Sequence, residues 1–257
     1  MSGTTFTPAV RRLFASYFAA DQVAHLRVVA HEHDHQYVTR GGGVTYGWMA
    51  YTVATGLGLP EPLARGAGEL LDALEPAIDL ADNLADTDLD RRLGRDPDAR
   101  YPGVPREALP ALPALIVGAC VAGLHERFPA PKWRPAHAAR RLLGVLGCMT
   151  HAQGLPLDHA ERNDALSGEA GLLWCLPLWL LPESHPAAGL APALEHWARQ
   201  FGSTIQLSMD VLENPSEPAR RERLDAARAS ARAIWPTTAP FRPQDALAAD
   251  RLLAGPA

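Results

Sequence analysis

Proline and glycine positions divide this chain into segments of helical length, and no other feature constrains its fold so strongly. Apolar residues within each segment recur at helical spacing, and the segments end near prolines, which cannot continue a helix interior. No run of convincing length shows the alternation and β-branched enrichment of a strand. The pattern predicts an all-α protein with helices at about residues 8–20, 22–36, 44–57, 61–92 with a kink at Pro76, 107–127, 135–153, 164–181, 187–214 and 218–234.

Size and composition favour one globular domain. With 257 residues, 47% of them apolar, and a formal net charge of −5, the chain is long enough to bury one sizeable core and does not require a second. We expect a single helical domain over residues 1–236, followed by an irregular tail rich in proline and alanine over residues 237–257.

Composition also argues against two classes of partner. Basic residues are scattered along the chain, which gives no electrostatic footprint for nucleic acid. The apolar run at residues 170–182 has 13 residues and contains Pro177, whereas a membrane-spanning helix needs about 20. The N-terminus lacks the apolar core of a secretory signal. We therefore expect a cytoplasmic protein without a membrane span or a nucleic-acid partner.

An acidic cluster, DLADNLADTDLDRR at residues 79–92, closes the predicted helix 61–92. Asp82 and Asp86 are four residues apart and share one helix face, which Asp79 and Asp90 extend by a turn in each direction. Neighbouring carboxylates repel one another unless they are solvated or bridged by a hard cation such as Mg²⁺. The two arginines that follow suit a phosphate ligand. The alternative is an acidic helix end that faces water.

The cluster resembles the first aspartate-rich motif of the all-helical polyprenyl diphosphate synthase family, D-D-x-x-D followed after four residues by R-R. Asp82, Asn83 and Asp86 fall on its three acidic positions, and Arg91 and Arg92 fall on its arginines. Asn83 is the one departure, because a neutral amide replaces the second aspartate.

A second stretch, FGSTIQLSMDVLE at residues 201–213, is similar to the family's second motif, F-G-x-x-x-Q-x-x-D-D-x-x-D. Gln206 falls on the glutamine, and the acidic positions are taken in order by Met209, Asp210 and Glu213. Residues 152–154 and 167–173 resemble the family's G-Q and K-T-G-A-L-L segments, so the resemblance covers about residues 35–215.

Two cation-bearing segments of the family are altered here. The G-G-K-R-x-R-P segment, which holds the diphosphate of isopentenyl diphosphate in elongating members, corresponds to GGGVTYG at residues 41–47, and Arg40 is the only basic residue nearby. The lysine of K-T-G-A-L-L is replaced by Ser167 or Gly168. Each lost charge-assisted hydrogen bond costs about 1.5 to 3 kcal/mol, so a conventional isopentenyl site is not expected.

Two further positions are similar to those of terpene cyclases. Glu217 follows Glu213 by four residues, which puts Met209, Glu213 and Glu217 in the register of the cyclases' second Mg²⁺-binding motif. Pro215 lies between the two glutamates, and if it breaks the helix Glu217 is a surface residue. Arg162 lies roughly where cyclases keep an arginine that senses diphosphate.

The resemblance implies a helical bundle of the isoprenoid synthase type with a central apolar cavity, a prenyl diphosphate substrate and Mg²⁺ as cofactor. It assigns the metal to Asp82, Asp86, Asp210, Glu213 and Glu217, and diphosphate binding to Arg91, Arg92, Gln206 and Arg162. Without an isopentenyl site, cyclisation or a related lyase reaction is expected rather than chain elongation. The open alternatives are a polyprenyl diphosphate synthase, acting as a prenyltransferase, and a non-catalytic subunit or regulator. Such a chain would form a homodimer or a heteromer with another synthase.

Three other groups of side chains have two interpretations each. Within HEHDH at residues 31–35, alternate residues of a helix point about 200° apart, so His31 and His33 cannot chelate one ion and a solvated helix end is expected. The cysteines lack C-x-x-C spacing, so buried free thiols are expected rather than a disulfide or a zinc site. Six aromatic residues would either line the cavity or belong to the core: Tyr46, Trp48, Tyr51, Trp174, Trp179 and Trp197.

Overall fold

The computed structural model of the chain confirms the all-α prediction. It describes residues 7–39, 45–85, 100–154 and 159–213, together with residues 222, 224–226, 229 and 233, and these ranges contain helices and no strand. At residues 35–39, 159–164 and 205–213 the backbone is described and the side chains are not. The predicted tail, residues 237–257, lies outside these ranges.

The chain divides into two compact units. Residues 1–49 and 65–129 form the first unit, and residues 50–64 and 130–257 form the second. The expectation of a single domain therefore stays a prediction.

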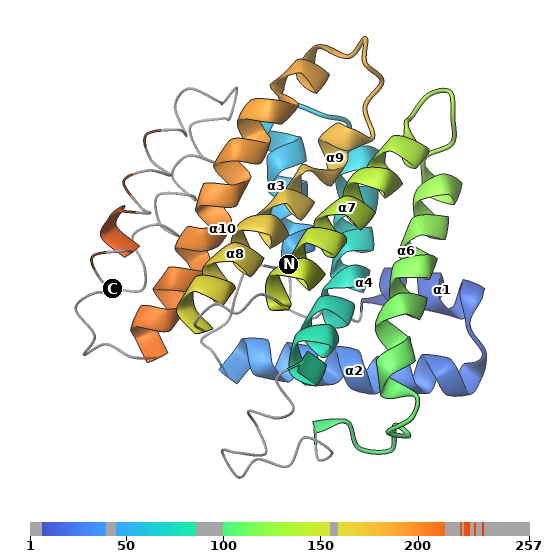
Figure 1. Ribbon diagram of the computed structural model, residues 1–257. Helices are drawn as coiled ribbons and strands as arrows, with labels where there is room; N and C mark the ends of the chain where they lie inside the picture. The colour runs from blue at the N-terminus through green and yellow to red at the C-terminus, as the bar shows by residue number, and fades with distance from the viewer. Residues whose placement is uncertain are drawn as a thin grey trace. The chain divides into compact units, whose positions relative to one another are not determined.

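The first unit is built from α1 (Pro8–Tyr17), α2 (Ala20–Thr39), the start of α3 (Tyr46–Gly56), most of α4 (Glu61–Ala85), η2 (Leu109–Ala111) and α6 (Leu112–Arg127). Helix α1 begins with a proline in its first turn and with the Thr7 hydroxyl, which accepts a hydrogen bond from the Val10 amide at 3.3 Å. Helix α1 packs on α2 and α6, and α2 runs across the C-terminal half of α4 (Figure 1).

Close packing in the first unit depends on a glycine in α6. A Cβ atom at Gly123 would lie 2.9 Å from side-chain carbons of both Leu13 and Leu70, closer than real Cβ atoms approach their neighbours. One turn earlier, the Cys120 thiol lies 3.6 Å from the Leu70 carbonyl oxygen. Helix α4 continues through Pro76, the position of the predicted kink, as one helix.

By length and composition alone, Leu109–Arg127 is the one candidate for a membrane-spanning helix in the described part of the chain. It has 19 residues, 39% of its most apolar window is buried, and it packs against α1. A core helix of a globular protein passes the same test of length and composition.

The second unit contains α7 (Pro135–Gln153), α8 (His159–Gly171), η3 (Leu172–Cys175), α9 (Leu176–Trp179), η4 (Pro186–Leu190) and α10 (Ala191–Glu213). Helices α8 and α10 lie side by side (Figure 1). Their backbones meet at Gly171 and Gly202, where a Cβ atom would collide with the carbonyl groups of Ala198 and Ser167.

The predicted helix 164–181 is wrong in both its bounds and its continuity. Helix α8 begins at His159 and ends at Gly171, and the chain then tightens into η3 before the single turn of α9. Pro177 explains the change, because its ring clashes with the carbonyl four residues earlier and it has no N–H to donate. The local 3₁₀ geometry over Leu172–Cys175 avoids that clash.

Three of the six aromatic residues named above, Trp174, Trp179 and Trp197, are core residues of the second unit. Trp174 and Trp197 form a buried cluster with Phe201, in which the ring centroids are 5.0 to 6.3 Å apart. Trp179 is also buried, and its indole N–H donates to Glu195 at 2.8 Å. Of the three cysteines, Cys120 and Cys175 are buried as expected, whereas Cys148 is exposed, which corrects the expectation for that residue.

Candidate functional site

A polar stripe runs along one face of α4. Asp72, Glu75, Asp79 and Asp82 follow one another at spacings of three and four residues, which keeps them on one face of a helix. Asp72 and Glu75 are 5% and 4% exposed, the Asp79 side chain is 24% exposed, and Asp82 is half-buried. The stripe therefore begins in the interior of the first unit and emerges toward the end of α4.

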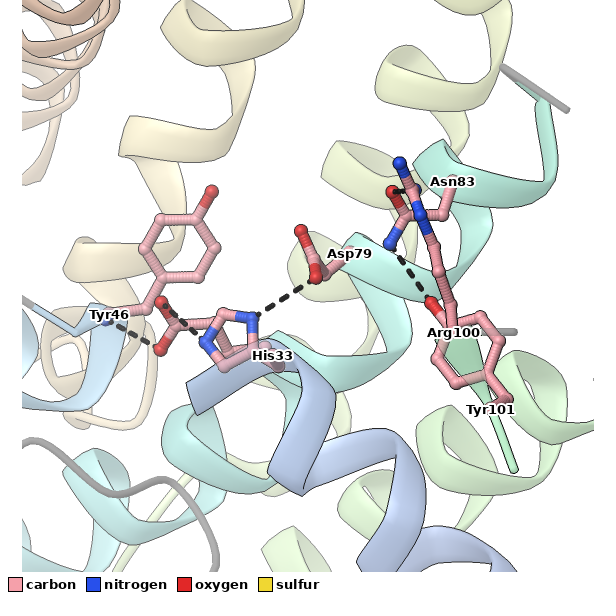
Figure 2. A network of polar contacts seen from close by, with 7 residues as sticks. His33, Tyr46, Asp79, Asn83, Arg100 and Tyr101 are labelled. Atoms are coloured by element: carbon pink, nitrogen blue, oxygen red, sulfur yellow. Dashed lines mark hydrogen bonds and ion pairs between the residues drawn. The ribbon is translucent and has the colours of Figure 1, made fainter. Parts of the chain in front are cut away.

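His33 of α2 bridges two carboxylates of this stripe. Its Nδ1 atom lies 3.4 Å from Asp79 Oδ2, and its Nε2 atom lies 3.5 Å from Glu75 Oε1 (Figure 2). Glu75 in turn accepts a hydrogen bond from the Tyr46 amide at 3.1 Å. One imidazole thus ties α2 to α4, and one carboxylate ties α4 to the first residue of α3.

The expectation of a solvated helix end at residues 31–35 is wrong for His33, which is 6% exposed. Helix α2 continues to Thr39, so the histidine string lies inside the helix. His33 is also three, four and seven residues after Ala30, Val29 and Leu26, all of which are buried. That apolar stripe was the signal in the sequence that could have placed His33 on the buried face.

The start of α3 is capped by acidic residues of α4. Asp72 accepts hydrogen bonds from the Thr45 hydroxyl and the Gly47 amide, and the Thr45 oxygen accepts from the Trp48 amide at 3.0 Å. Carboxylates are stabilised at a helix N-terminus because the unsatisfied N–H groups there carry partial positive charge. A Cβ atom at Gly47 would collide with the Asp72 side chain and the Gly68 carbonyl, so only glycine fits this approach of α3 to α4.

Burial and pairing shift the pKa values within this cluster. Burial lowers the pKa of His33, but its contacts with Asp79 and Glu75 outweigh burial and raise that pKa to about 10. Burial raises the pKa of Glu75, although the nearby His33 opposes this shift. Burial and the nearby Glu75 raise the pKa of Asp72 to about 7. The raised pKa of His33 favours a protonated imidazole at neutral pH.

Near the outer end of the stripe, Asn83 contacts two residues that follow the predicted motif in the chain, Arg100 and Tyr101. Asn83 Oδ1 accepts a hydrogen bond from Arg100 Nη1 at 2.5 Å, and Asn83 Nδ2 donates to the Tyr101 hydroxyl at 2.9 Å (Figure 2). Tyr101 is 5% exposed, whereas Arg100 is half-buried. The amide that departs from the family pattern thus makes contacts at both of its polar atoms.

The structure describes one of the nine predicted site residues with its side chain, namely Asp82. Four others have a described backbone only: Arg162 on α8 and Gln206, Asp210 and Glu213 on α10. The remaining four lie outside the described residues: Asp86, Arg91, Arg92 and Glu217. In the residues described, no group of three or more histidine, cysteine, aspartate or glutamate side chains could hold a metal ion.

The segment that resembles K-T-G-A-L-L lies within the contact between α8 and α10. A Cβ atom at Gly168 would lie 3.2 Å from the Ser203 hydroxyl, and the Ser167 carbonyl faces Gly202. The smallness of these residues is therefore explained by helix packing in the second unit.

Comparisons with protein-family models, curated proteins and solved structures found no match to this chain. The resemblance to isoprenoid synthases therefore rests on the motifs alone. Sequence reasoning also missed four residues of the polar network: Asp72, Glu75, Arg100 and Tyr101. For Asp72 and Glu75 a signal was present, since they precede Asp79 at spacings of seven and four residues on the same helix face.

Proposed function

We propose that this protein is a Mg²⁺-dependent isoprenoid synthase of class I that ionises an allylic prenyl diphosphate. We further propose that it acts as a terpene cyclase or related lyase rather than as an elongating enzyme. The observation that carries the proposal is the carboxylate stripe of α4, which leads from buried Glu75 to half-buried Asp82 at the first motif.

The arrangement of the stripe supports a binding role for Asp82. The buried end of the stripe is fixed in place, because His33 and the start of α3 both contact Glu75. Asp82 lies one turn beyond Asp79 at the end where the stripe emerges. A carboxylate in that position combines a fixed backbone with access from solvent, as a ligand-binding group requires.

The chemistry of the donors fits Mg²⁺, which prefers carboxylate oxygens and retains sites for phosphate oxygens. The resemblance assigns the ion to Asp82, Asp86, Asp210, Glu213 and Glu217. Bound there, Mg²⁺ would supply positive charge to the diphosphate as its carbon–oxygen bond breaks. Arg91, Arg92, Gln206 and Arg162 would hold the diphosphate in place and add to its neutralisation.

The start of α3 favours the cyclase branch of the proposal. In the segment that corresponds to the isopentenyl site, Thr45, Tyr46 and Gly47 contact Asp72 and Glu75 and supply no cation. An allylic cation formed without a second substrate can be captured by its own double bonds or by water. Both captures give a lyase product rather than a longer chain.

The test is turnover with defined substrates. Purified protein with Mg²⁺ should release pyrophosphate from geranyl, farnesyl or geranylgeranyl diphosphate in the absence of isopentenyl diphosphate. Asp82→Ala should abolish this release, and the exposed carboxylate of α2 offers a matched control in Asp21→Ala, which should retain it. Turnover that strictly requires isopentenyl diphosphate, with longer linear products, would establish the prenyltransferase instead.

A second candidate is a non-catalytic subunit or regulator of such an enzyme. It is favoured by Asn83, since the second acidic position of the motif is an amide that binds Arg100 and Tyr101. This candidate predicts that the pure protein is inert toward all three prenyl diphosphates and forms a stable heteromer with an intact synthase.

A further inference from the structure

Asp72 brings an unsatisfied oxygen into the interior of the first unit. It belongs to the buried end of the α4 stripe and is 5% exposed. The Thr45 hydroxyl and the Gly47 amide, both at the start of α3, donate to its carboxyl group. Among the described residues, however, no hydrogen-bond donor contacts its buried Oδ1 atom. Buried acceptors are normally satisfied in folded proteins, so this oxygen requires an explanation.

A second acceptor lies beside this oxygen. A Cβ atom at Gly47 would collide with both Asp72 Oδ1 and the Gly68 carbonyl oxygen, so the two oxygens lie against the same point of α3. Gly68 precedes Asp72 by four residues on α4, the spacing at which a side-chain hydroxyl reaches a backbone carbonyl. Two neighbouring acceptors repel each other, whereas a proton on Asp72 turns one of them into a donor.

Hydroxyl groups elsewhere in the chain already make the contact that a protonated Asp72 would make. Four of them donate to the carbonyl oxygen four residues earlier, at 2.7 to 2.9 Å: Ser16, Thr55, Thr150 and Thr204. A helical carbonyl oxygen can accept such a bond because it has two lone pairs and the backbone N–H uses one. A neutral carboxyl group carries one O–H donor and can serve in the same way.

The surroundings of Asp72 favour its neutral form. Burial is the largest cause that raises the pKa of Asp72 from 3.8 to about 7, and the nearby Glu75 and Glu69 of α4 act in the same direction. The hydrogen bonds from α3 act against this shift and are outweighed. The raised pKa therefore agrees with the geometry, in which Oδ1 lies beside another acceptor.

Charged and titratable groups of the neighbouring helices are directed at these two glutamates. His33 of α2 contacts Glu75, and Arg127 of α6 binds Glu69 at 2.6 Å. On α3, the Tyr46 amide donates to Glu75, and burial raises the pKa of the Tyr46 phenol, which keeps it neutral. Helices α2, α3 and α6 thus act on the two glutamates that flank Asp72 on α4.

We infer that Asp72 carries a proton on Oδ1 that it donates to the Gly68 carbonyl oxygen, and that loss of this proton loosens the first turn of α3 from α4. In the protonated form, one carboxyl group donates to α4 and accepts from α3, so it joins the two helices. In the ionised form a buried charge lies beside an acceptor, and separation of the α3 start admits water to it. Asp72 is then a proton-operated clamp where α3 begins, and this role does not depend on the proposed function.

The first experiment locates the proton in the native chain. The chemical shift of the Asp72 carboxyl carbon, followed by NMR from pH 3 to pH 9, should show a midpoint at about 7. A midpoint near the ordinary value of 3.8 would mean that Asp72 is ionised in the folded chain at neutral pH, and the inference would be wrong. Because this titration needs no variant, it decides the matter whether or not substitutions of Asp72 fold.

Hydrogen exchange at the amides of Gly47 and Met49, in the first turn of α3, tests the clamp itself. Opening exposes Asp72, which then releases its proton, so opening becomes easier as the pH rises between 3.8 and about 7. After correction for intrinsic exchange, the opening constant should rise about 100-fold from pH 4.5 to pH 6.5, tenfold for each pH unit. Above pH 7 it should level off, because Asp72 is then ionised in both forms.

Asp72→Asn is the decisive variant. Its side-chain amide can donate to the Gly68 carbonyl oxygen and does not titrate, so the opening constant should stay low across the range. Asp21→Asn, at an exposed position of α2, should keep the native rise. The Cys120 amide of α6 reports opening of the core, and faster exchange at Gly47 than at Cys120 would assign the rise to local opening. Equal rises in native and Asp72→Asn proteins, or equally slow exchange at Gly47 and Cys120, would overturn the inference.

Discussion

The imidazole of His33 lies 3.4 Å from the carboxylate of Asp79, one helical turn before the first aspartate of the predicted motif. The contact joins α2 to α4 inside the first unit. The other ring nitrogen of His33 faces buried Glu75. A charged histidine at this point offsets the desolvation of two carboxylates. The polar stripe of α4 therefore depends on a residue far from it in sequence.

The first prediction concerns the pH dependence of stability that His33 causes. Its pKa is about 10 in the folded chain, against an ordinary value of 6.5, so the folded chain retains a proton that the unfolded chain loses. The stabilisation is complete below pH 6.5 and is lost as the pH rises toward 10. Urea unfolding of the native protein should show a falling free energy of unfolding across that window.

Removing His33 should abolish the part of the decline that its proton causes. In His33→Gln no imidazole gains a proton on folding at this position, so the fall in the free energy of unfolding between pH 6.5 and 10 should be smaller than in the native protein. His31→Gln, which removes an exposed histidine of the same helix, should keep the native profile. A His33→Gln profile with the native window would contradict the assignment.

The second prediction is that Asp72→Asn stabilises the protein above pH 7. The pKa of Asp72 rises from 3.8 to about 7 on folding, so ionisation opposes folding, and stability falls as the pH rises between these values. An amide carries no such cost, and the gain at pH 8 should approach about 4 kcal/mol, since one pKa unit is worth about 1.4 kcal/mol.

The comparison at low pH controls for other effects of this substitution. Below pH 3.8 both forms are neutral in both states, so native and Asp72→Asn proteins should have similar free energies of unfolding. Asp21→Asn, at an exposed position of α2, should differ little from the native protein at either pH. Equal destabilisation by Asp72→Asn at pH 3.5 and pH 8 would show that its hydrogen bonds outweigh its charge.

The third prediction is that Gly47→Ala destabilises the first unit by about 1 to 3 kcal/mol, the usual cost of overpacking. The added methyl group would collide with the backbone carbonyl of Gly68 as well as with Asp72, so a side-chain rotation alone does not relieve it. Gly118→Ala is the matched control within α6, because nothing lies within 4 Å of its Cβ position. That control should stabilise the protein by about 0.5 to 1 kcal/mol, as expected for a helical glycine. Chemical denaturation of both variants measures the contrast.

Local signals in the sequence predicted the helices well where one residue decides a boundary. Helix α7 spans residues 135–153 as predicted, because Pro135 suits the first turn of a helix, and α4 begins at residue 61 as predicted after Pro60. The stretch after Gly171 was mispredicted, because apolar periodicity outweighed Pro177 in the interpretation. The all-α class thus follows from local patterns.

The polar network could not be predicted in the same way, because its partners are distant in sequence. Glu75 and the Tyr46 amide are separated by 29 residues, and neither sequence position alone indicates a buried pair. Asp82 could be named as a candidate because its motif is local. Arg100 was missed because its link to Asn83 spans 17 residues.

The last prediction separates a binding site at Asp82 from an acidic helix face in water. If Asp82 takes part in binding Mg²⁺ and pyrophosphate, the two ligands together should stabilise the native protein by about 2.7 kcal/mol at a hundredfold excess over Kd. Asp82→Ala should abolish this shift, because the carboxylate that would bind the ligands is absent. Asp21→Ala should keep the full shift, since its carboxylate is exposed on α2. Thermal melts with and without both ligands measure the effect. Retention of the whole shift by Asp82→Ala would remove Asp82 from the site and leave the carboxylate stripe with a structural role only.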